Sequence, residues 1–203
     1  MKIAIFGATG MVGSRLVDEA MARGHEVTAV TRNGRAIPGT TAVAMDFTDT
    51  PAVVELANAS DVVIISIPPD RSRVEPIEVN LHAHQRLIDA VPSARIIVVG
   101  GAGSLKVAGT YLRDRPGFPE AAMRNSTWGI SMLERYQASP PALDWLVVSP
   151  SPLIEPGQRT GHYVLGIDEP AGQRVSAENF AVGILDEIED PDHHRMRITF
   201  ADK

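Results

Sequence analysis

Three glycines stand three residues apart near the start of the chain, directly after an apolar run. They are Gly7, Gly10 and Gly13, within the segment IFGATGMVG of residues 5–13. A loop of this kind between a first strand and a first helix lets the backbone approach a pyrophosphate, while the helix N-terminus offers free amides and a favourable dipole. In order, the glycines suit the tight turn, the close approach and helix–strand packing. The alternative is an ordinary tight turn.

The end of the second expected strand indicates which dinucleotide the loop would bind. An NAD site places Asp or Glu about 20 residues beyond the glycines, where it holds the ribose hydroxyls. Here the sequence reads AVTRNGR, which places Arg32 and Arg35 at that point and no carboxylate. A guanidinium can hold a 2′-phosphate through bidentate, charge-assisted bonds. The sequence therefore predicts NADP(H) in preference to NAD(H); the alternative is that both arginines are solvated loop cations.

The composition predicts a single globular domain over residues 1–203. Apolar residues make up 44% of the chain and charged residues 22%, which is ordinary globular usage. The formal net charge of −6 disfavours nucleic acid as a partner. Because the chain has no cysteine, disulfides, thiolate catalysis and zinc–cysteine sites are excluded. The first strand begins at Lys2 and no apolar run approaches the roughly 20 residues of a membrane span, so we expect a cytoplasmic protein without a membrane partner.

Short apolar runs alternate with longer amphipathic stretches along the chain. This pattern is typical of a Rossmann-type, doubly wound α/β fold, a mostly parallel sheet with helices on both faces. The nearly continuous hydrophobicity of the runs indicates strands buried on both faces. The expected strands are residues 2–6, 27–31, 62–67, 96–99 and 143–148, with 42–44 as a weaker candidate.

Four helices are expected between and after these strands. Their apolar stripes run from Val12 to Met21, from Val74 to Ala90, from Met123 to Leu133 and from Phe180 to Ile188. Gly24 can adopt the left-handed backbone conformation that ends the first helix, and Ser176 is a suitable N-cap for the last helix. The weak helix formers Ser126, Thr127 and Gly129 are expected to interrupt the third.

Three further stretches complete the chain. The strict alternation of RMRITF, residues 195–200, predicts a strand with one exposed face. Residues 100–119 and 149–173 are rich in Gly and Pro and resist assignment, but both follow strands and should lie over the carboxyl edge of the sheet, where such folds bind ligands. Within the single domain, residues 149–203 would supply small substrate-side elements and the last helix and strand.

Several segments together resemble a known family. They are GATGMVG, VTRN, MDFTD at residues 45–49 and VVGGAGSL at residues 98–105. These segments resemble the atypical short-chain dehydrogenase/reductases. More narrowly, the chain is similar to the small NAD(P)H-binding group that includes NmrA-like proteins and the biliverdin-IXβ/flavin reductases. The likeness covers nearly the whole chain and includes SPSPLIEPGQRTG at residues 149–161.

The resemblance implies a set of cofactor-binding residues. Asp46 and Phe47 would flank the adenine, and Ser66, Ile67 and Pro68 would border the ribose and nicotinamide. Gly100, Gly101 and Ser104 would lie near the nicotinamide ring. The glycine loop would contribute Gly7, Thr9, Gly10, Met11, Val12 and Gly13. The alternatives are that Asp46 caps a turn, that Ser66 ends a buried strand and that the later glycines serve backbone geometry.

The acid used by most reductases of the wider superfamily is missing. That acid is a tyrosine with a lysine four residues later, but the residues four after Tyr111, Tyr136 and Tyr163 are Arg115, Pro140 and Ile167. Without a tuned acid, reduction of an unactivated ketone loses roughly 100- to 10,000-fold in rate. A flavin, quinone or tetrapyrrole bridge can instead take hydride first and a proton from water afterwards. We therefore expect an NADPH-dependent reductase of a small conjugated acceptor, with Ser104 and Tyr111 as the candidate hydrogen-bond donors.

Two other functions remain open. An NmrA-like protein would sense NADP(H) and pass its state to a protein partner without turnover, and an idle family member would hold the cofactor as a structural group. Phe118, Trp128 and Trp145 are candidates to line an aromatic pocket, although Trp145 suits the core better. No metal site is predicted, because His82 and His84 point in different directions on a helix, and His193 and His194 belong to a turn.

Overall fold

The computed structural model describes residues 1–69 and 76–203. Its main sheet contains eight strands: β1 (Lys2–Phe6), β2 (Glu26–Thr31), β3 (Thr41–Ala44), β4 (Val62–Ile65), β5 (Arg95–Val99), β8 (Trp145–Pro150), β10 (Tyr163–Ile167) and β12 (Met196–Asp202). Their order across the sheet is β10-β12-β8-β5-β4-β1-β2-β3. Only β10 among these runs antiparallel to its neighbour, β12.

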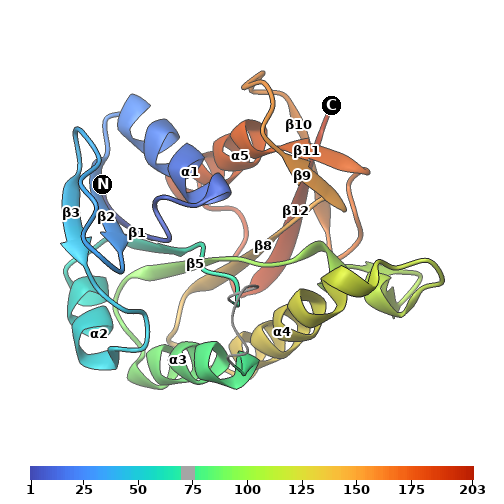
Figure 1. Ribbon diagram of the computed structural model, residues 1–203, viewed down its shortest axis with the longest axis horizontal. Coiled ribbons are helices and arrows are strands. Elements are labelled where there is room, and N and C mark those ends of the chain that lie inside the picture. Colours follow the sequence, from blue (N-terminus) through green and yellow to red (C-terminus); the bar gives the residue numbers. More distant parts are fainter. Residues whose placement is uncertain (70–75) are drawn as a thin grey trace.

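Helices cover both faces of this sheet (Figure 1). They are α1 (Met11–Ala22), α2 (Thr50–Asn58), α3 (Ile77–Ala90), α4 (Glu120–Gln137) and α5 (Ala177–Glu189). The helices α1 and α5 pack on one face, over a core that includes Ile5, Leu16 and Phe180. The other three lie on the opposite face, over a core that includes Val63, Leu87 and Trp145. The predicted doubly wound α/β fold is confirmed.

The predicted strands are all present, and the helices differ from the predictions in two places. No helix is predicted from the sequence at α2, which has nine residues and an Asp49 N-cap whose side chain accepts from the Ala52 amide. The predicted interruption of α4 is wrong. The helix runs unbroken through Ser126 and Thr127, whose hydroxyls are satisfied within it because each donates to the carbonyl four residues earlier. Val74, the predicted start of the second helix, lies outside the described residues.

The predicted exposed face of the last strand is also wrong. Of the three polar residues in the alternating pattern, Arg197 and Thr199 are 3% and 0% exposed, and Arg195 is half-buried. The face of β12 that carries Arg197 is covered by segments distant in the chain, since its guanidinium reaches Ser104 and Asp168. Burial of Arg197 is compensated because its guanidinium pairs with the Asp168 carboxylate at 2.6 Å and donates to the Ser104 carbonyl.

The two unassigned stretches form small elements. Residues 100–119 contain the 3₁₀ turns η1 (Ala102–Ser104) and η2 (Leu112–Asp114), with the short hairpin strands β6 (Lys106–Val107) and β7 (Thr110–Tyr111) between them. Residues 149–173 contain β10 and the strand β9 (Leu153–Glu155), which pairs with β11 (Arg174–Ser176). The order of the sheet reverses between β1 and β4, and the crevice at such a point is where open α/β sheets bind ligands.

Candidate functional site

The glycine loop joins β1 to α1 at this reversal point, and the surrounding backbone leaves no space for a side chain at Gly7 or Gly13. A Cβ at Gly7 would lie 2.3 Å from the Ser66 carbonyl oxygen, and Gly7 has a φ of +78°. A Cβ at Gly13 would lie 2.0 Å from the Gly7 carbonyl oxygen. Glycine is therefore required at Gly7 for the turn and at Gly13 for the packing of helix on strand.

Gly10 differs from the other two because its backbone conformation is ordinary. It is the N-cap of α1, with a φ of −73°, and no side chain caps it and no acidic residue occupies the first turn. A Cβ there would lie 3.2 Å from the Gly7 carbonyl oxygen. The first amides of a helix have no partner within it, so this end of α1 presents donors and the positive end of the dipole. Thr9, Gly10 and Met11 are exposed beside it, and this open cradle fits a diphosphate.

Arg32 and Arg35 follow β2 and are both exposed. Asp46 follows β3 and accepts hydrogen bonds at one carboxylate oxygen from the amide and hydroxyl of Thr48, at 2.9 and 2.7 Å. These two bonds, together with the nearby charge of Arg32, lower the pKa of Asp46. Asp46 is thus an ionised turn residue close to Arg32.

Phe47, predicted to flank the adenine, directs its ring into the core. The ring is 6% exposed and makes edge contacts with Phe6 and His84, at centroid distances of 5.5 and 4.9 Å. Its backbone remains next to Asp46, but an adenine would not meet its aromatic face.

The carboxyl ends of three neighbouring strands bring other predicted residues together. Gly7 follows β1, Ser66 follows β4 and Gly100 follows β5, and these strands are adjacent. The Ser66 amide donates to the Phe6 carbonyl at 3.0 Å, and the Gly100 amide donates to the Val148 carbonyl at 2.9 Å. Residues 66–68 and 100–101 therefore lie along the same edge as the glycine loop.

Ser104 lies behind this edge and is 1% exposed. Its hydroxyl donates to the Gly101 carbonyl at 2.7 Å, and its own carbonyl accepts from the buried Arg197. Ser104 would therefore have to leave its bond to Gly101 before its hydroxyl could reach a substrate. What it does in this structure is hold the turn after β5.

Tyr111 is half-buried in the β6–β7 hairpin, and the structure places a lysine beside it. Lys106 is the cross-strand partner of Tyr111, and its ammonium lies 5.0 Å from the centre of the ring. The search for a lysine four residues after each tyrosine could not find this pair, because Lys106 precedes Tyr111. The two residues meet because the chain turns at Ala108–Gly109, where both residues have positive φ. The ammonium covers the ring face, which is a cation–π arrangement.

The predicted aromatic residues divide between core and edge. Trp145 is 1% exposed, which confirms its place in the core. Trp128 is 2% exposed and its indole donates to the Asn80 side chain at 2.7 Å, so it also belongs to the interior. Phe118 is half-buried in the loop before α4.

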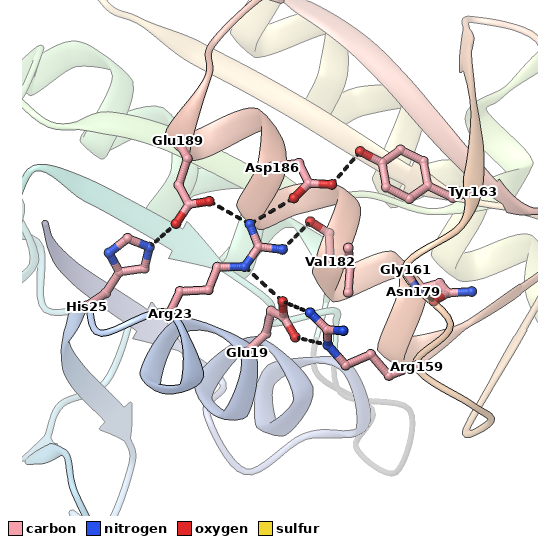
Figure 2. A network of polar contacts seen from close by, with 10 residues as sticks. All are labelled: Glu19, Arg23, His25, Arg159, Gly161, Tyr163, Asn179, Val182, Asp186 and Glu189. Carbon is pink, nitrogen blue, oxygen red and sulfur yellow. Dashed lines mark hydrogen bonds and ion pairs between the residues drawn. The ribbon is translucent and has the colours of Figure 1, made fainter.

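A network of ion pairs that is not predicted from the sequence joins α1 to α5 (Figure 2). Glu19 of α1 is 5% exposed. Its carboxylate accepts two hydrogen bonds from the Arg159 guanidinium, at 2.6 and 2.8 Å, and one from Arg23 at 2.8 Å. Bonds from Arg159 and then from Arg23 lower the pKa of Glu19 against the opposing effect of burial. Arg23 also pairs with Asp186 of α5 at 2.8 Å. The network fixes the helix that carries the glycine loop.

The histidines are dispersed among different partners. His84 is fully buried with its Nδ1 3.1 Å from the Tyr136 hydroxyl, whereas His82 is exposed. His193 and His194 contact two different carboxylates, those of Glu187 and Asp144. In the part of the chain that the structure describes, no three His, Cys, Asp or Glu residues are grouped as a metal site would require. None of the described helices is long and apolar enough to cross a membrane.

A family model described as NAD(P)H-binding matches residues 7–191. The chain belongs to this NAD(P)H-binding family. The match begins at the first glycine of the cradle and includes all of the strands that form the crevice except β1 and β12. The resemblance to the NAD(P)H-binding group of the atypical short-chain dehydrogenase/reductases is confirmed, and the cofactor is a nicotinamide dinucleotide.

Similar proteins occur in several bacteria. The uncharacterised protein YwnB of Bacillus subtilis (strain 168) is 33% identical over 214 residues, which cover 98% of this chain and 97% of YwnB. A Burkholderia pseudomallei protein whose name proposes that it is exported is 36% identical over 99% of both chains, with a TM-score of 0.87. SP1627 of Streptococcus pneumoniae TIGR4, whose name proposes an NADH-flavin reductase, is 28% identical over 100% of both chains, with a TM-score of 0.84.

Proposed function

We propose that this protein is an NADPH-dependent reductase that passes hydride to a small conjugated acceptor such as a flavin or a quinone. The observation that carries the proposal is the open glycine cradle at the N-terminus of α1, with Arg32 and Arg35 at the adjacent strand tip. The flavin reductase named among the similar structures supports the acceptor class.

The preference for NADPH rests on charge at the end of β2. Arg32 and Arg35 are exposed there, and the carboxylate near Arg32 is Asp46, one of whose oxygens is already held by Thr48. A 2′-phosphate would gain charge-assisted bonds from a guanidinium that a ribose hydroxyl would not. NADH has no 2′-phosphate and would therefore not gain these charge-assisted bonds.

The chain contributes binding and orientation to the reaction. The bound NADPH supplies the hydride, and the acceptor must lie against its nicotinamide face. We propose that residues 66–68, Gly100 and Gly101 border that space, that Ser104 positions Gly101, and that Tyr111 donates a hydrogen bond to the acceptor. The proton that follows hydride comes from water, so no buried acid is needed.

The test is anaerobic mixing of the purified protein with NADPH and, separately, FMN, FAD, a quinone and an aldehyde, following loss of reduced-nicotinamide absorbance. We expect turnover with the flavins or the quinone and none with the aldehyde. Tight binding of NADPH without turnover on any acceptor would overturn the enzyme proposal in favour of an NmrA-like sensor with a protein partner. Location in the cytoplasm, without membrane or nucleic acid partners, is part of the proposal and is checked by fractionating cells that express the protein.

A further inference from the structure

The strand β10 forms one edge of the main sheet and carries an unusual set of side chains. Val164, Leu165 and Ile167 are 42%, 37% and 51% exposed, although each is a large aliphatic residue. The five residues of the strand, YVLGI, include no charged residue and no proline. Natural proteins normally protect an edge strand with charges, proline, a bulge or a covering segment. This edge therefore has the properties of a strand that pairs with another.

The opposite edge of the sheet does not share these properties. β3 has four residues, TAVA, and none of them is among the large exposed apolar residues of the described chain. The contrast places the apolar surface at one edge only, as a specific contact would require.

The strand is held in an extended, fixed position by its neighbours. The Tyr163 ring packs on Phe200 at a centroid distance of 4.8 Å, and its hydroxyl donates to Asp186 of α5 at 2.7 Å (Figure 2). At the other end, Asp168 pairs with the buried Arg197 at 2.6 Å. Because both ends are anchored, a partner strand would meet an ordered edge and little conformational entropy would be lost.

The sequence of β10 is complementary to itself in the antiparallel direction. If Leu165 of one copy faces Leu165 of another, Tyr163 faces Ile167 and Val164 faces Gly166, so every pair within the strand is apolar. The register ends with the strand, because Asp168 has a φ of +59° and its carbonyl accepts from the Lys106 amide. Directly opposite residues of an antiparallel pair lie on the same face. This register joins Tyr163, Leu165 and Ile167 of both copies into one apolar stripe.

We propose that two copies of this protein associate through β10, in antiparallel register about Leu165, to form a continuous sheet across the dimer. The outer backbone groups of β10 gain hydrogen-bond partners, and the exposed aliphatic side chains are removed from water. The paired segment is only five residues long, so we expect a dimer that dissociates on dilution. The association does not depend on which hydride acceptor binds in the crevice.

Because the chain has no cysteine, single introduced cysteines can test the register directly. Opposed residues of an antiparallel pair have Cα atoms about 4.5–5.5 Å apart, within the range of a disulfide. We expect Leu165→Cys to form a covalent dimer under mild oxidation, in proportion to the non-covalent dimer present. Ala42→Cys, exposed on the β3 edge, is the matched control and is expected to cross-link far more slowly.

Sedimentation velocity across a range of concentrations tests the association itself. We expect a concentration-dependent dimer for the natural protein and a monomer for Leu165→Arg, because two guanidinium groups would face each other at the centre of the interface. Far-ultraviolet circular dichroism checks that the variant is folded; if it is not, the cross-linking of Leu165→Cys decides. A natural protein that stays monomeric throughout, or equal cross-linking of the two cysteine variants, would overturn the proposal and leave β10 for another partner.

Discussion

The residues of the glycine loop carry two separate demands, one of folding and one of binding. At Gly7 and Gly13 a methyl group would collide with backbone at 2.3 and 2.0 Å, so substitution there damages the fold and says little about a ligand. At Gly10 the nearest atom to an added methyl is 3.2 Å away, a tight contact that a small shift relieves, and φ is −73°, which any residue adopts. Gly10 is therefore the position at which binding can be tested apart from folding.

We expect Gly10→Ala to fold and to bind the dinucleotide poorly. The added methyl occupies the path by which a diphosphate approaches the first amides of α1, so NADPH should bind at least roughly tenfold more weakly. The free energy of unfolding without ligand should change by about 1 kcal/mol or less, as for most tolerated substitutions. Calorimetric titration and urea unfolding measure the two quantities. Gly13→Ala is the contrast and should lose most of its stability; normal NADPH affinity in Gly10→Ala would contradict the cradle.

The guanidinium of Arg32 decides the proposed choice of cofactor. We expect Arg32→Ala to weaken NADPH binding by about 10- to 150-fold, which corresponds to the loss of a hydrogen bond to a charged group of about 1.5–3 kcal/mol. NADH binding should change by less than about threefold, because it lacks the 2′-phosphate. Titration of both cofactors measures the difference, with Arg174→Ala, an exposed arginine paired with Glu155, as control. Equal weakening for both cofactors would refute the assigned role.

At the scale of elements, the sequence predicts whatever depends on local periodicity. The buried strands read as continuous apolar runs, and α1 and α5 show a clear apolar stripe with the expected Gly24 and Ser176 at their boundaries. The helix α2 was missed because only Val53 and Ala57 of its nine residues are buried, which leaves a weak stripe. The alternation in β12 predicted exposure, but its polar residues are buried because distant segments cover them. Pairing partners from other parts of the chain have no local signal.

In the candidate site, too, some features follow from the local sequence and others depend on contacts between distant segments. The glycine turn and the strand tips follow from order along the chain, and the structure places Gly7, Ser66 and Gly100 at one edge. The position of the Ser104 backbone depends on Arg197, which donates to the Ser104 carbonyl from 93 residues away in the chain. The pairs Glu19–Arg159 and Lys106–Tyr111 likewise depend on the final packing of loops. Side chains that act through such contacts are visible only in the folded molecule.

The packing of α3 on α4 buries a titratable group, and this predicts a dependence of stability on pH. Burial, with a smaller effect of Arg135, lowers the pKa of His84 to about 3. An unfolded histidine has a pKa of about 6.5, so below that pH the unfolded chain gains a proton that the folded chain does not. Stability should therefore decrease as the pH falls from about 6.5 towards 3.

We expect His84→Leu to reduce this slope between about pH 6.5 and 4.5, where the histidine accounts for about 2 kcal/mol. The variant loses the bond to Tyr136 at every pH, but that lowers the whole curve and leaves the slope unaffected, since burial raises the pKa of Tyr136. Urea unfolding at several pH values measures the slope. His82→Leu, at an exposed position in the same helix, is the control. An unchanged slope in His84→Leu would show that another group is responsible.

For the whole molecule, one sheet carries both cores, so the two faces cannot unfold independently. The strand residues of β1, β4 and β5 alternate between the core under α1 and α5 and the core under the other helices. The ion-pair network between α1 and α5 also joins the first helix of the chain to the last (Figure 2). We therefore expect thermal unfolding in a single transition, because a domain that shares its core strands in this way behaves as one cooperative unit.

Binding at the crevice should stabilise that whole unit. At about 100 times its Kd, a ligand that binds only the folded state contributes about 2.7 kcal/mol. For a domain of this size each kcal/mol raises the Tm by about 2–4 °C, so saturating NADPH should raise it by roughly 5–11 °C. NADH at the same concentration should give a smaller shift. A tenfold weaker site is stabilised by about 1.4 kcal/mol at that concentration, so the shift with NADPH should fall to about half or less in Gly10→Ala. Differential scanning calorimetry measures these shifts at one protein concentration, because the proposed dimer also makes the Tm depend on concentration. Equal shifts for NADH and NADPH would contradict the proposal that Arg32 binds the 2′-phosphate of NADPH.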